Sequence, residues 1–363
     1  MVSEMNKACL LYGAGDARFE NIPTPSLKDS PRDVLIRIAY TGVCGSDVHF
    51  WVHGGINEMI RPGFPVTLGH EASGVVAAIG SAVTTLKVGD RVAIEPGFPC
   101  RYCSFCLAGK YNLCPEMAFA ASPGPGPVVH GTLATFFRLP SDFCYQIPDH
   151  LGLDEGAIFE PLAVAIHCLF LSKLKPGQEV LVLGAGPVGL LTCAVAREFG
   201  AGRVTVVDVN NERLRFAAEE LKVSTHRFDA AISVEKNAEV LVAEKGLREG
   251  ADIVIEATGV ASCVQLGIEL IKKGGSYVQV GLGKKIVEFP LVVMSEKEIT
   301  LRGCFRYGPG DFALASRLVG RGKIPLKAFV SKVFPFHQAP DAWEAARKGQ
   351  GVKFLIQVDG SQA

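Results

Sequence analysis

Residues 179–208 read EVLVLGAGPVGLLTCAVAREFGAGRVTVVD, and this stretch decides the fold of the surrounding chain. Its first five residues form a short apolar run that ends at glycine, which is typical of a buried strand. Residues 187–199 have the spacing of a helix, and residues 204–209 form a second apolar run. The order strand, glycine-rich turn, helix, strand predicts a βαβ unit within a parallel sheet.

The turn has the pattern Gly184-x-Gly186-x-x-Gly189. The first glycine permits a tight turn, the second lets the backbone approach a pyrophosphate, and the third lets the helix pack closely on the strand. The N-terminus of the helix would then face the phosphates, because its free N–H groups attract anions. This pattern, in this context, predicts a dinucleotide site.

An acidic residue completes the unit. Asp208 lies 19 residues after Gly189, at the end of the second predicted strand, where a carboxylate can bind the adenosine ribose hydroxyls. A carboxylate there would repel a 2′-phosphate, so we expect NAD rather than NADP. The nearby Arg213 could bind a 2′-phosphate and so partly favours NADP, although we expect its side chain to lie beside the adenine. A structural turn followed by a surface aspartate is the alternative, and the complete ordered unit disfavours it.

The alternation of strands and helices extends on both sides of this unit. Helical patterns at 161–174, 211–221 and near 261–272 alternate with apolar runs at 251–258 and 276–282. We therefore predict a Rossmann domain at 161–299, a doubly wound parallel sheet with helices on both faces. Glu160 precedes Pro161, so its backbone is expected to be extended.

The rest of the chain is rich in glycine, proline and short β-type runs. Together, residues 1–160 and 300–363 are predicted to form a β-rich domain that carries a metal-binding lobe. The predicted strands are 33–43, 72–80 and the run after Gly89-Asp90, followed near the C-terminus by 332–336, the helix 339–349 and 352–358.

Composition narrows the class of protein. The chain has 363 residues, 48% apolar and 20% charged, with a formal net charge of zero. Nothing in this balance indicates a nucleic-acid partner, which usually requires a basic face. The longest uncharged stretch, residues 180–196, is interrupted by glycines and a proline, so no membrane helix is expected there. Early charges also argue against a secretory leader, and we expect a cytoplasmic protein.

Four of the 11 cysteines are clustered as Cys100-x2-Cys103-x2-Cys106-x7-Cys114. Four thiolates at this spacing can surround one tetrahedral zinc ion and leave no open position, which is typical of a structural site. An iron–sulfur cluster uses similar spacing, but nothing else in the chain indicates electron transfer. Disulfides are disfavoured in the cytoplasm. We therefore predict a structural zinc that folds a lobe and takes no part in chemistry.

A second metal site is predicted from Cys44 in GVCGSDVH and His70-Glu71 in LGHEASG. One thiolate, one imidazole and one carboxylate leave a zinc position open for water or substrate. Glu160 is a fourth candidate, directly or through a water. Singly, each of these residues has a more ordinary interpretation as a core or capping residue. Together with a nicotinamide fold and a closed cysteine site, they predict a catalytic zinc.

These motifs together resemble the zinc-containing medium-chain dehydrogenases, within them the sorbitol and xylitol dehydrogenase branch, and most of all the fungal xylitol dehydrogenases (D-xylulose reductases). The resemblance covers nearly the whole chain. It implies a GroES-like catalytic domain beside the Rossmann domain, and a homotetramer. It rests on GVCGSDVHFW, LGHEASG, GDRVAIEPG, YNLCPEMAFAA, EPLAVAIH, GAGPVGLL, GCFRYG and DFCYQIPDHL.

The implied reaction is reversible transfer of hydride from a secondary hydroxyl of a polyol to NAD, with xylitol first and sorbitol second. Zinc as a Lewis acid would lower the pKa of the hydroxyl, and the nicotinamide would take the hydride. Asp47 is expected to orient His70, with a capping aspartate as the alternative. Ser46 and His49 are expected to carry the alcohol proton outward.

The substrate pocket is expected to include Phe50, Phe119, Glu160, Arg306 and Tyr307. Mammalian sorbitol dehydrogenases usually have tyrosine where this chain has Phe50, which weakens the case for hexitols. The rivals are an L-arabinitol, other diol or simple-alcohol dehydrogenase and a non-enzymatic binder of the same fold, and the intact metal residues argue against the binder. His167 is expected to be a core residue. The expected cofactor contacts are Gly184, Gly186, Pro187, Val188, Gly189, Asp208, Arg213, Val280, Gly281, Leu282, Cys304, Phe305 and Arg306.

Overall fold

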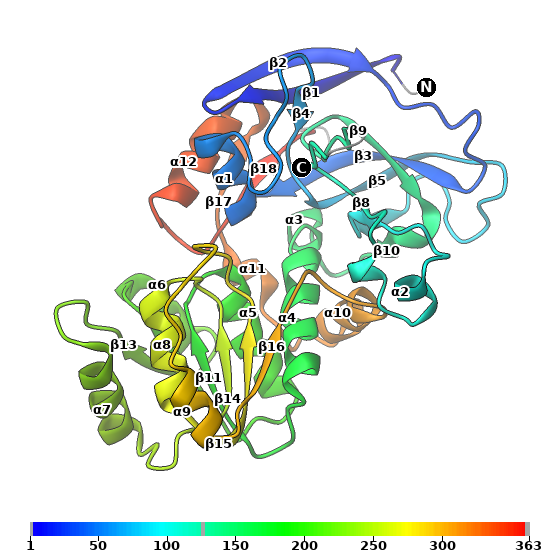
Figure 1. The fold of residues 1–363 in the computed structure, drawn as a ribbon. Helices are drawn as coiled ribbons and strands as arrows, with labels where there is room; N and C mark the ends of the chain where they lie inside the picture. The colour runs from blue at the N-terminus through cyan, green and yellow to red at the C-terminus, as the bar shows by residue number, and fades with distance from the viewer. Residues whose placement is uncertain (1–2, 125–127, 360–363) are drawn as a thin grey trace. The chain divides into compact units, whose positions relative to one another are not determined.

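The computed structural model describes residues 3–124 and 128–359 and divides the chain into two compact units (Figure 1). Unit 1 comprises Met1–Glu160, Phe312–Arg321 and Leu326–Ala363, and unit 2 comprises Pro161–Asp311 and Gly322–Pro325. The predicted change of character at residue 160 falls at the first crossing between the units. The return near residue 300 differs, because the segment at 300–303 still pairs with the sheet of unit 2.

Unit 1 is built on a seven-stranded sheet in the order β10-β6-β5-β3-β18-β17, with β9 also paired to β3. The chain supplies β17 and β18 from its C-terminal part, which joins the N-terminal strands through the β18–β3 pair. A three-stranded sheet β2-β1-β4 and a two-stranded sheet β7-β8 complete it. The strands are β1 (Met5–Gly13), β2 (Asp16–Pro23), β3 (Asp33–Gly42), β4 (Val66–Thr67), β5 (Glu71–Ile79), β6 (Arg91–Ile94), β7 (Gly97–Phe98), β8 (Ala118–Phe119), β9 (Phe136–Pro140), β10 (Cys144–Gln146), β17 (Val330–Pro335) and β18 (Lys353–Gln357).

Short helices join these strands, and apolar clusters of buried side chains form the core of unit 1. One cluster surrounds Trp343, whose ring lies 5.3 Å from that of Trp51, and another lines β3, β5 and β6. Burial of such large apolar side chains is the main favourable term in folding. The helices are α1 (Gly45–His53), α2 (Ser104–Leu107), α3 (Leu153–Gly156), α10 (Asp311–Gly320), α11 (Leu326–Phe329) and α12 (Ala339–Arg347), with 3-10 turns at Tyr111–Leu113, Ser141–Phe143 and Phe336–Gln338.

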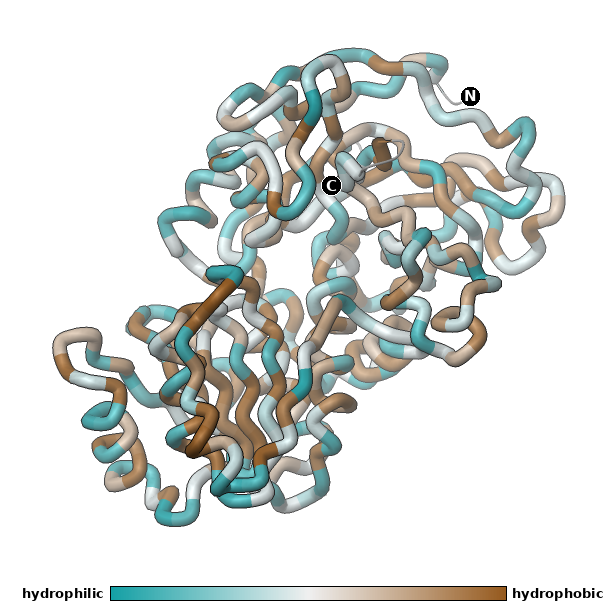
Figure 2. Tube along the Cα trace, viewed as in Figure 1, coloured by the Kyte–Doolittle hydropathy of each residue, from teal (hydrophilic) through white to brown (hydrophobic). Residues whose placement is uncertain are grey.

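Unit 2 is a six-stranded parallel sheet in the order β13-β12-β11-β14-β15-β16, flanked by helices (Figure 1). The strand order reverses direction between β11 and β14, as in a doubly wound dinucleotide-binding fold, so this part of the predicted fold class is confirmed. Its central strands are apolar (Figure 2) and buried. The strands are β11 (Glu179–Leu183), β12 (Arg203–Asp208), β13 (Ser224–Arg227), β14 (Ala251–Glu256), β15 (Ile271–Gln279) and β16 (Thr300–Gly303).

The helices of unit 2 follow the expected alternation, with additions. The sequence pattern predicted α4, α5, α6 and α8 but not α7, α9, β13 or β16. The stretch that forms β13 and α7 is polar and weakly periodic. Figure 1 shows α7 beside α8. The helices are α4 (Phe159–Ser172), α5 (Pro187–Glu198), α6 (Asn211–Glu219), α7 (Val234–Lys245), α8 (Ala261–Leu270) and α9 (Leu291–Glu296).

The predicted extended backbone at Glu160 is wrong. The helix α4 begins at Phe159, so Glu160 is helical and Pro161 lies in the first turn. The first N–H groups of a helix have no partner within the helix, and a proline there costs little. This position therefore overrides the steric bias that proline imposes on its predecessor.

One stretch, Leu153–Ser172, is long and apolar enough to cross a membrane by composition, but 72% of its most apolar window is buried inside the protein. Core helices of globular proteins pass the same test, so this is weak support for a membrane span. The uncharged stretch at 180–196 is divided between β11 and α5, as expected.

Candidate metal and cofactor sites

Three side chains with metal-binding atoms converge in unit 1. Cys44 directly precedes α1, His70 directly precedes β5, and Glu71 is the first residue of that strand. The Cys44 thiol, an imidazole nitrogen of His70 and a carboxylate oxygen of Glu71 lie within 4.8 Å of one another. A sulfur, a nitrogen and an oxygen this close fit the donor preferences of zinc and leave a fourth position open.

Asp47 connects the two segments that carry these side chains. Its carboxylate accepts hydrogen bonds from the Cys44 N–H at 2.9 Å and from the Gly69 N–H at 3.3 Å. His70 Nδ1 lies 3.8 Å from Asp47 Oδ1, which is too long for a direct hydrogen bond. Asp47 therefore caps α1 and holds the backbone next to His70, and its role in orienting the imidazole stays a prediction.

Sequence reasoning missed Lys353, which begins β18 and is 1% exposed. Its ammonium group forms an ion pair with Glu71 Oε2 and donates a hydrogen bond to the Val43 carbonyl at 2.9 Å. Gly42 makes room for this pair, because a Cβ there would lie 2.2 Å from Glu71 Oε2. A lysine inside the apolar run VKFLIQV was the available signal, since buried lysines almost always have a partner.

Glu160 lies in the first turn of α4, buried at 6% exposure. Burial raises the pKa of its carboxyl to about 8; Glu71 and Cys44 act in the same direction, while His70 and Lys353 oppose them. Burial also raises the pKa of the Cys44 thiol to about 12. Without a cation, burial thus favours the neutral forms of Glu160 and Cys44, and a divalent cation would compensate the charge of their anionic forms.

Of the other residues predicted for this site, some lie close to the metal-binding side chains and others do not. The ring of Phe119 lies 5.4 Å from that of His70. Phe50 is instead buried in the apolar cluster around Trp343. His49 is exposed, with its ring 5.7 Å from that of His53, and Ser46 is half-buried. The assigned roles of these side chains stay predictions.

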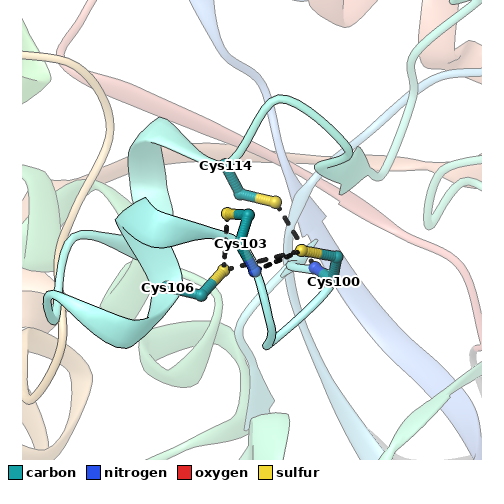
Figure 3. A group of neighbouring side chains, drawn as sticks. All are labelled: Cys100, Cys103, Cys106 and Cys114. Atoms are coloured by element: carbon teal, nitrogen blue, oxygen red, sulfur yellow. Dashed lines mark hydrogen bonds between the residues drawn. The ribbon is translucent and has the colours of Figure 1, made fainter.

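The four clustered cysteines surround one point in unit 1, and their sulfurs face one another (Figure 3). The sulfurs of Cys103 and Cys106 are 3.5 Å apart and those of Cys100 and Cys106 are 3.9 Å apart, so these thiols are free rather than disulfide-bonded. Hydrogen bonds, first from the Cys106 backbone, lower the pKa of Cys103 to about 7. A lowered pKa favours the thiolate of Cys103, whereas burial raises the pKa of the Cys106 thiol to about 12.

This lobe is attached to the sheet through a buried carboxylate, Glu95, which sequence reasoning also missed. Glu95 accepts a hydrogen bond from the Tyr111 hydroxyl in the lobe and another from Tyr145 of β10 at 2.8 Å. Buried carboxylates are stable only where such donors replace water. The two tyrosines thus join the cysteine lobe to the seven-stranded sheet, in which β6 pairs with β5, the strand that begins with Glu71.

In unit 2, the glycine-rich turn has the geometry that its pattern predicts. Gly184 has φ of 104°, which favours glycine. A Cβ at Gly189 would lie 1.9 Å from the Gly184 carbonyl oxygen, so helix α5 can approach β11 only with glycine there. Gly186 precedes α5, and a Cβ there would meet nothing within 4 Å. That open space lies at the N-terminus of a helix, where a phosphate is favoured.

Asp208 ends β12, next to this turn. Its carboxylate accepts hydrogen bonds from the Ala185 N–H at 2.6 Å and the Asn210 N–H at 2.8 Å. Two acceptor sites of the carboxylate are thereby used to hold the turn, and others can still accept from ribose hydroxyls. Arg213 lies in the first turn of the next helix, α6.

The remaining predicted residues of unit 2 follow β15 and β16. The backbone of Cys304 donates to the Gln279 carbonyl at 2.8 Å, which joins the two strand ends. Arg306 has φ of 61°, unusual for a residue with a side chain, and its guanidinium lies 4.6 Å from the centre of the Phe305 ring. Tyr307 is buried at 2% exposure.

His167 does more than fill space in α4. Its Nδ1 lies 3.0 Å from Asp311 Oδ2, and the same oxygen accepts a hydrogen bond from the Gly308 N–H at 2.6 Å. The His167 ring also occupies the space beside Gly308, where a Cβ would lie 2.9 Å from it. The pair therefore fixes the turn that follows Arg306 and Tyr307.

Comparisons with known proteins agree with this geometry. The family described as "Alcohol dehydrogenase GroES-like domain" matches residues 30–149, and "Zinc-binding dehydrogenase" matches residues 187–321. The chain is 49% identical to "Probable D-xylulose reductase A" of Aspergillus fumigatus over 97% of this chain and 96% of that protein. The chain belongs to the zinc-containing medium-chain dehydrogenases.

Solved structures support the same family. A dehydrogenase of unknown specificity from Escherichia coli is similar at a TM-score of 0.89 and 33% identity, over 97% of this chain and 99% of that one. L-idonate 5-dehydrogenase from Escherichia coli is similar at a TM-score of 0.86 and 28% identity, over 97% and 98%.

As a zinc-containing medium-chain dehydrogenase of the sorbitol and xylitol dehydrogenase branch, the protein is an oxidoreductase with the expected GroES-like and Rossmann-type parts. Both cysteine-containing metal sites fall within the segment that matches the GroES-like domain. The family that the sequence motifs indicated is therefore confirmed.

Proposed function

We propose that this dehydrogenase oxidises a secondary hydroxyl of a polyol with NAD, reversibly, and that xylitol and D-xylulose are its preferred pair. The observation that carries the proposal is the convergence of Cys44, His70 and Glu71, in a chain 49% identical to a protein named as a probable D-xylulose reductase. Sorbitol is the second substrate that we propose to test.

Zinc held by Cys44, His70 and Glu71 would act as a Lewis acid that lowers the pKa of a coordinated substrate hydroxyl. Glu160, buried beside these residues, would accept a hydrogen bond in the open position or bind the metal itself. Asp47 holds the backbone of both ligand segments, so the donor atoms are arranged before substrate arrives.

The proton of the alcohol must leave a largely buried site. We propose that Ser46 accepts it first and that His49, which is exposed on α1, delivers it to water. The free hydroxyls of the polyol would be bound by Arg306 and Tyr307, which offer the charged and hydroxyl groups that such a substrate requires. Phe119, against His70, would help to exclude water.

NAD bound at the carboxyl edge of the parallel sheet would supply the hydride acceptor. Asp208 and the turn at Gly184, Gly186 and Gly189 support binding of its adenosine and pyrophosphate parts. The carboxylate of Asp208 would disfavour the 2′-phosphate of NADP. We propose one catalytic and one structural zinc per chain, the latter bound by Cys100, Cys103, Cys106 and Cys114.

The proposal includes a cytoplasmic homotetramer. All 11 cysteines are free thiols, as expected of a reducing compartment. Self-association is supported by β16, which ends the described sheet, and by nearby apolar side chains that are exposed. These side chains are Leu282, Ile286, Leu291, Val292 and Leu301.

Steady-state kinetics on xylitol, sorbitol, L-arabinitol and ethanol, each with NAD and with NADP, test the proposal. We expect the highest kcat/KM for xylitol with NAD. Faster turnover of L-arabinitol would keep the polyol class and refute xylitol as the preferred substrate. Faster turnover of ethanol than of any polyol would refute the proposed substrate class, and a preference for NADP would refute the role of Asp208.

A further inference from the structure

A buried carboxylate outside the predicted site residues lies at the cofactor edge of unit 2. Glu256 is the last residue of β14 and is 0% exposed. Burying a carboxylate is costly unless several donors surround it. Its position at the carboxyl end of a central parallel strand is where such folds bind ligands. The hydrogen-bond donors around Glu256 therefore indicate which parts of the fold this carboxylate holds in place.

The Glu256 side chain holds the loop that directly follows it. One carboxylate oxygen accepts hydrogen bonds from the Thr258 N–H at 2.8 Å and from the Thr258 hydroxyl, and the other accepts from the Gly259 N–H at 2.9 Å. Hydrogen bonds to a charged acceptor are the stronger kind. They fix the loop at 257–259, where Gly259 has φ of 71°.

The same residue also holds the loop after β15. The Glu256 carbonyl accepts from the N–H groups of Val280 at 2.8 Å and Gly281 at 2.9 Å. Gln279 links both loops, because its Nε2 donates to Glu256 Oε2 at 2.5 Å and to the Gly281 carbonyl at 2.9 Å. Glu256 and Gln279 thus join the ends of two adjacent strands in one network.

The two loops pack closely enough against each other that only glycine fits at two positions. A Cβ at Gly281 would lie 2.2 Å from the Gly259 nitrogen, and one at Gly283 would lie 1.9 Å from the Gly259 carbonyl oxygen. A Cβ at Gly184 of the phosphate-binding turn would lie 2.6 Å from the Thr258 side chain. The network therefore extends to the turn that is proposed to bind the pyrophosphate.

The strand order tells which half of a dinucleotide these loops would receive. The order in which successive strands join the sheet reverses between β11 and β14, and a dinucleotide lies across that point with one half on each side. Asp208 is on the β12 side, with the adenosine half. The loops after β14 and β15 are therefore on the side of the nicotinamide half.

We propose that Glu256 is a positioning residue that holds these two loops in the shape required by the nicotinamide half of NAD. The inference rests on the proposed function, since it takes NAD as the ligand. It goes beyond that function by naming the buried group that acts through the loops. Glu256 itself touches neither cofactor nor substrate in this proposal.

Binding of NADH and of AMP to the Glu256→Gln variant, measured by calorimetry, tests this inference. AMP contains only the adenosine half, so it reports on Asp208 and not on the loops. Glutamine has nearly the same shape, but its NH2 group would face donors at Thr258 or Gly259 and push the loops apart. We expect the Kd for NADH to rise about tenfold or more, as for loss of one or two hydrogen bonds to a charged group, with the Kd for AMP unchanged.

Glu179→Gln is the matched control, because Glu179 begins β11 at the opposite edge of the same sheet and pairs with Arg203. We expect it to bind both ligands as the unaltered protein does. If Glu256→Gln does not fold, Gln279→Leu removes the second link between the loops, and the same selective loss of NADH binding is expected.

Two outcomes would overturn the role of Glu256. Equal weakening of NADH and AMP would mean that Glu256 only stabilises unit 2, and unchanged binding of both would mean that the loops do not depend on it. Failure of the proposed function looks different, because the unaltered protein itself would then bind no NADH.

Discussion

At the residue scale, the metal centre depends on side chains that bind no metal. Asp47 joins the backbone next to Cys44 to the backbone next to His70, and Lys353 pairs with the Glu71 carboxylate. The ligand candidates themselves could be predicted from their types and sequence context. Lys353 could not, because it lies 282 residues after Glu71 and reaches it only through the β5-β3-β18 order of the sheet.

Replacing Lys353 by methionine should lower the free energy of unfolding of the zinc-free protein more than that of the zinc-bound protein. The change leaves Glu71 buried without its cation, and breaking a buried pair in this way costs about 3 kcal/mol or more. Denaturant unfolding with and without zinc measures the effect, and we expect added zinc to restore part of the loss by binding Glu71 in place of the ammonium.

Lys323→Met provides the control, because Lys323 is exposed and its loss should change the free energy of unfolding by less than about 0.5 kcal/mol. An equally small effect for Lys353→Met would show that the buried pair is not needed to hold Glu71.

At the element scale, strong apolar periodicity was sufficient to predict β11, α5, β12, β14 and α8. Weak or polar patterns failed: β13, α7, α9 and β16 were missed. Glu160 shows the opposite error. The local rule that a residue before proline is extended predicted the wrong conformation, because Pro161 lies in the first turn of α4, where proline is tolerated. The cysteine lobe was predicted from spacing alone, because two-residue spacers between thiols have few other uses.

This lobe has little apolar core of its own. Its α2 has no buried residue, while Tyr102 is 66% and Leu107 is 77% exposed. We therefore expect Cys103→Ser to unfold the lobe, since three ligands bind zinc far more weakly than four and the folding of such a site depends on the metal. Limited proteolysis with mass spectrometry should show new cleavage between residues 100 and 116, and metal analysis should show one zinc fewer per chain.

Ser104→Ala, in the same short helix, should leave both the cleavage pattern and the zinc content unchanged. Zinc content equal to that of the unaltered protein in Cys103→Ser would contradict a structural metal at the four cysteines.

At the scale of the whole molecule, the sequence indicated two parts with crossings near residues 160 and 300, and the two compact units of the structure divide first at Glu160. The strand β16 continues the parallel sheet after a long loop, and only its register with β15 reveals this. The hydrogen-bond and ion-pair partners of Glu256 and His167 could not be predicted for a related reason. Strand order and helix packing, rather than separation along the sequence, bring these partners together. The fold class and the grouping of Cys44, His70 and Glu71 were thus predictable, and the supporting hydrogen bonds were not.

The exposed strand β16 makes a prediction about assembly. An uncovered edge strand with apolar neighbours favours pairing with another chain, and Leu301 in β16 is 44% exposed. We expect the protein to elute and scatter light as a tetramer, and Leu301→Lys to shift it toward smaller species. A monomeric unaltered protein would contradict the proposed assembly.

The central claim is that this chain oxidises polyols at a metal bound by Cys44, His70 and Glu71. Turnover of xylitol with NAD, compared between the unaltered protein and Cys44→Ser with zinc and NADH binding measured on both, tests it most directly. We predict a loss of at least ~1,000-fold in kcat, because several kcal/mol of charge stabilisation disappear, together with loss of one zinc and intact NADH binding. Cys144→Ser, outside both cysteine sites, should retain activity. Retained turnover in Cys44→Ser would contradict the account.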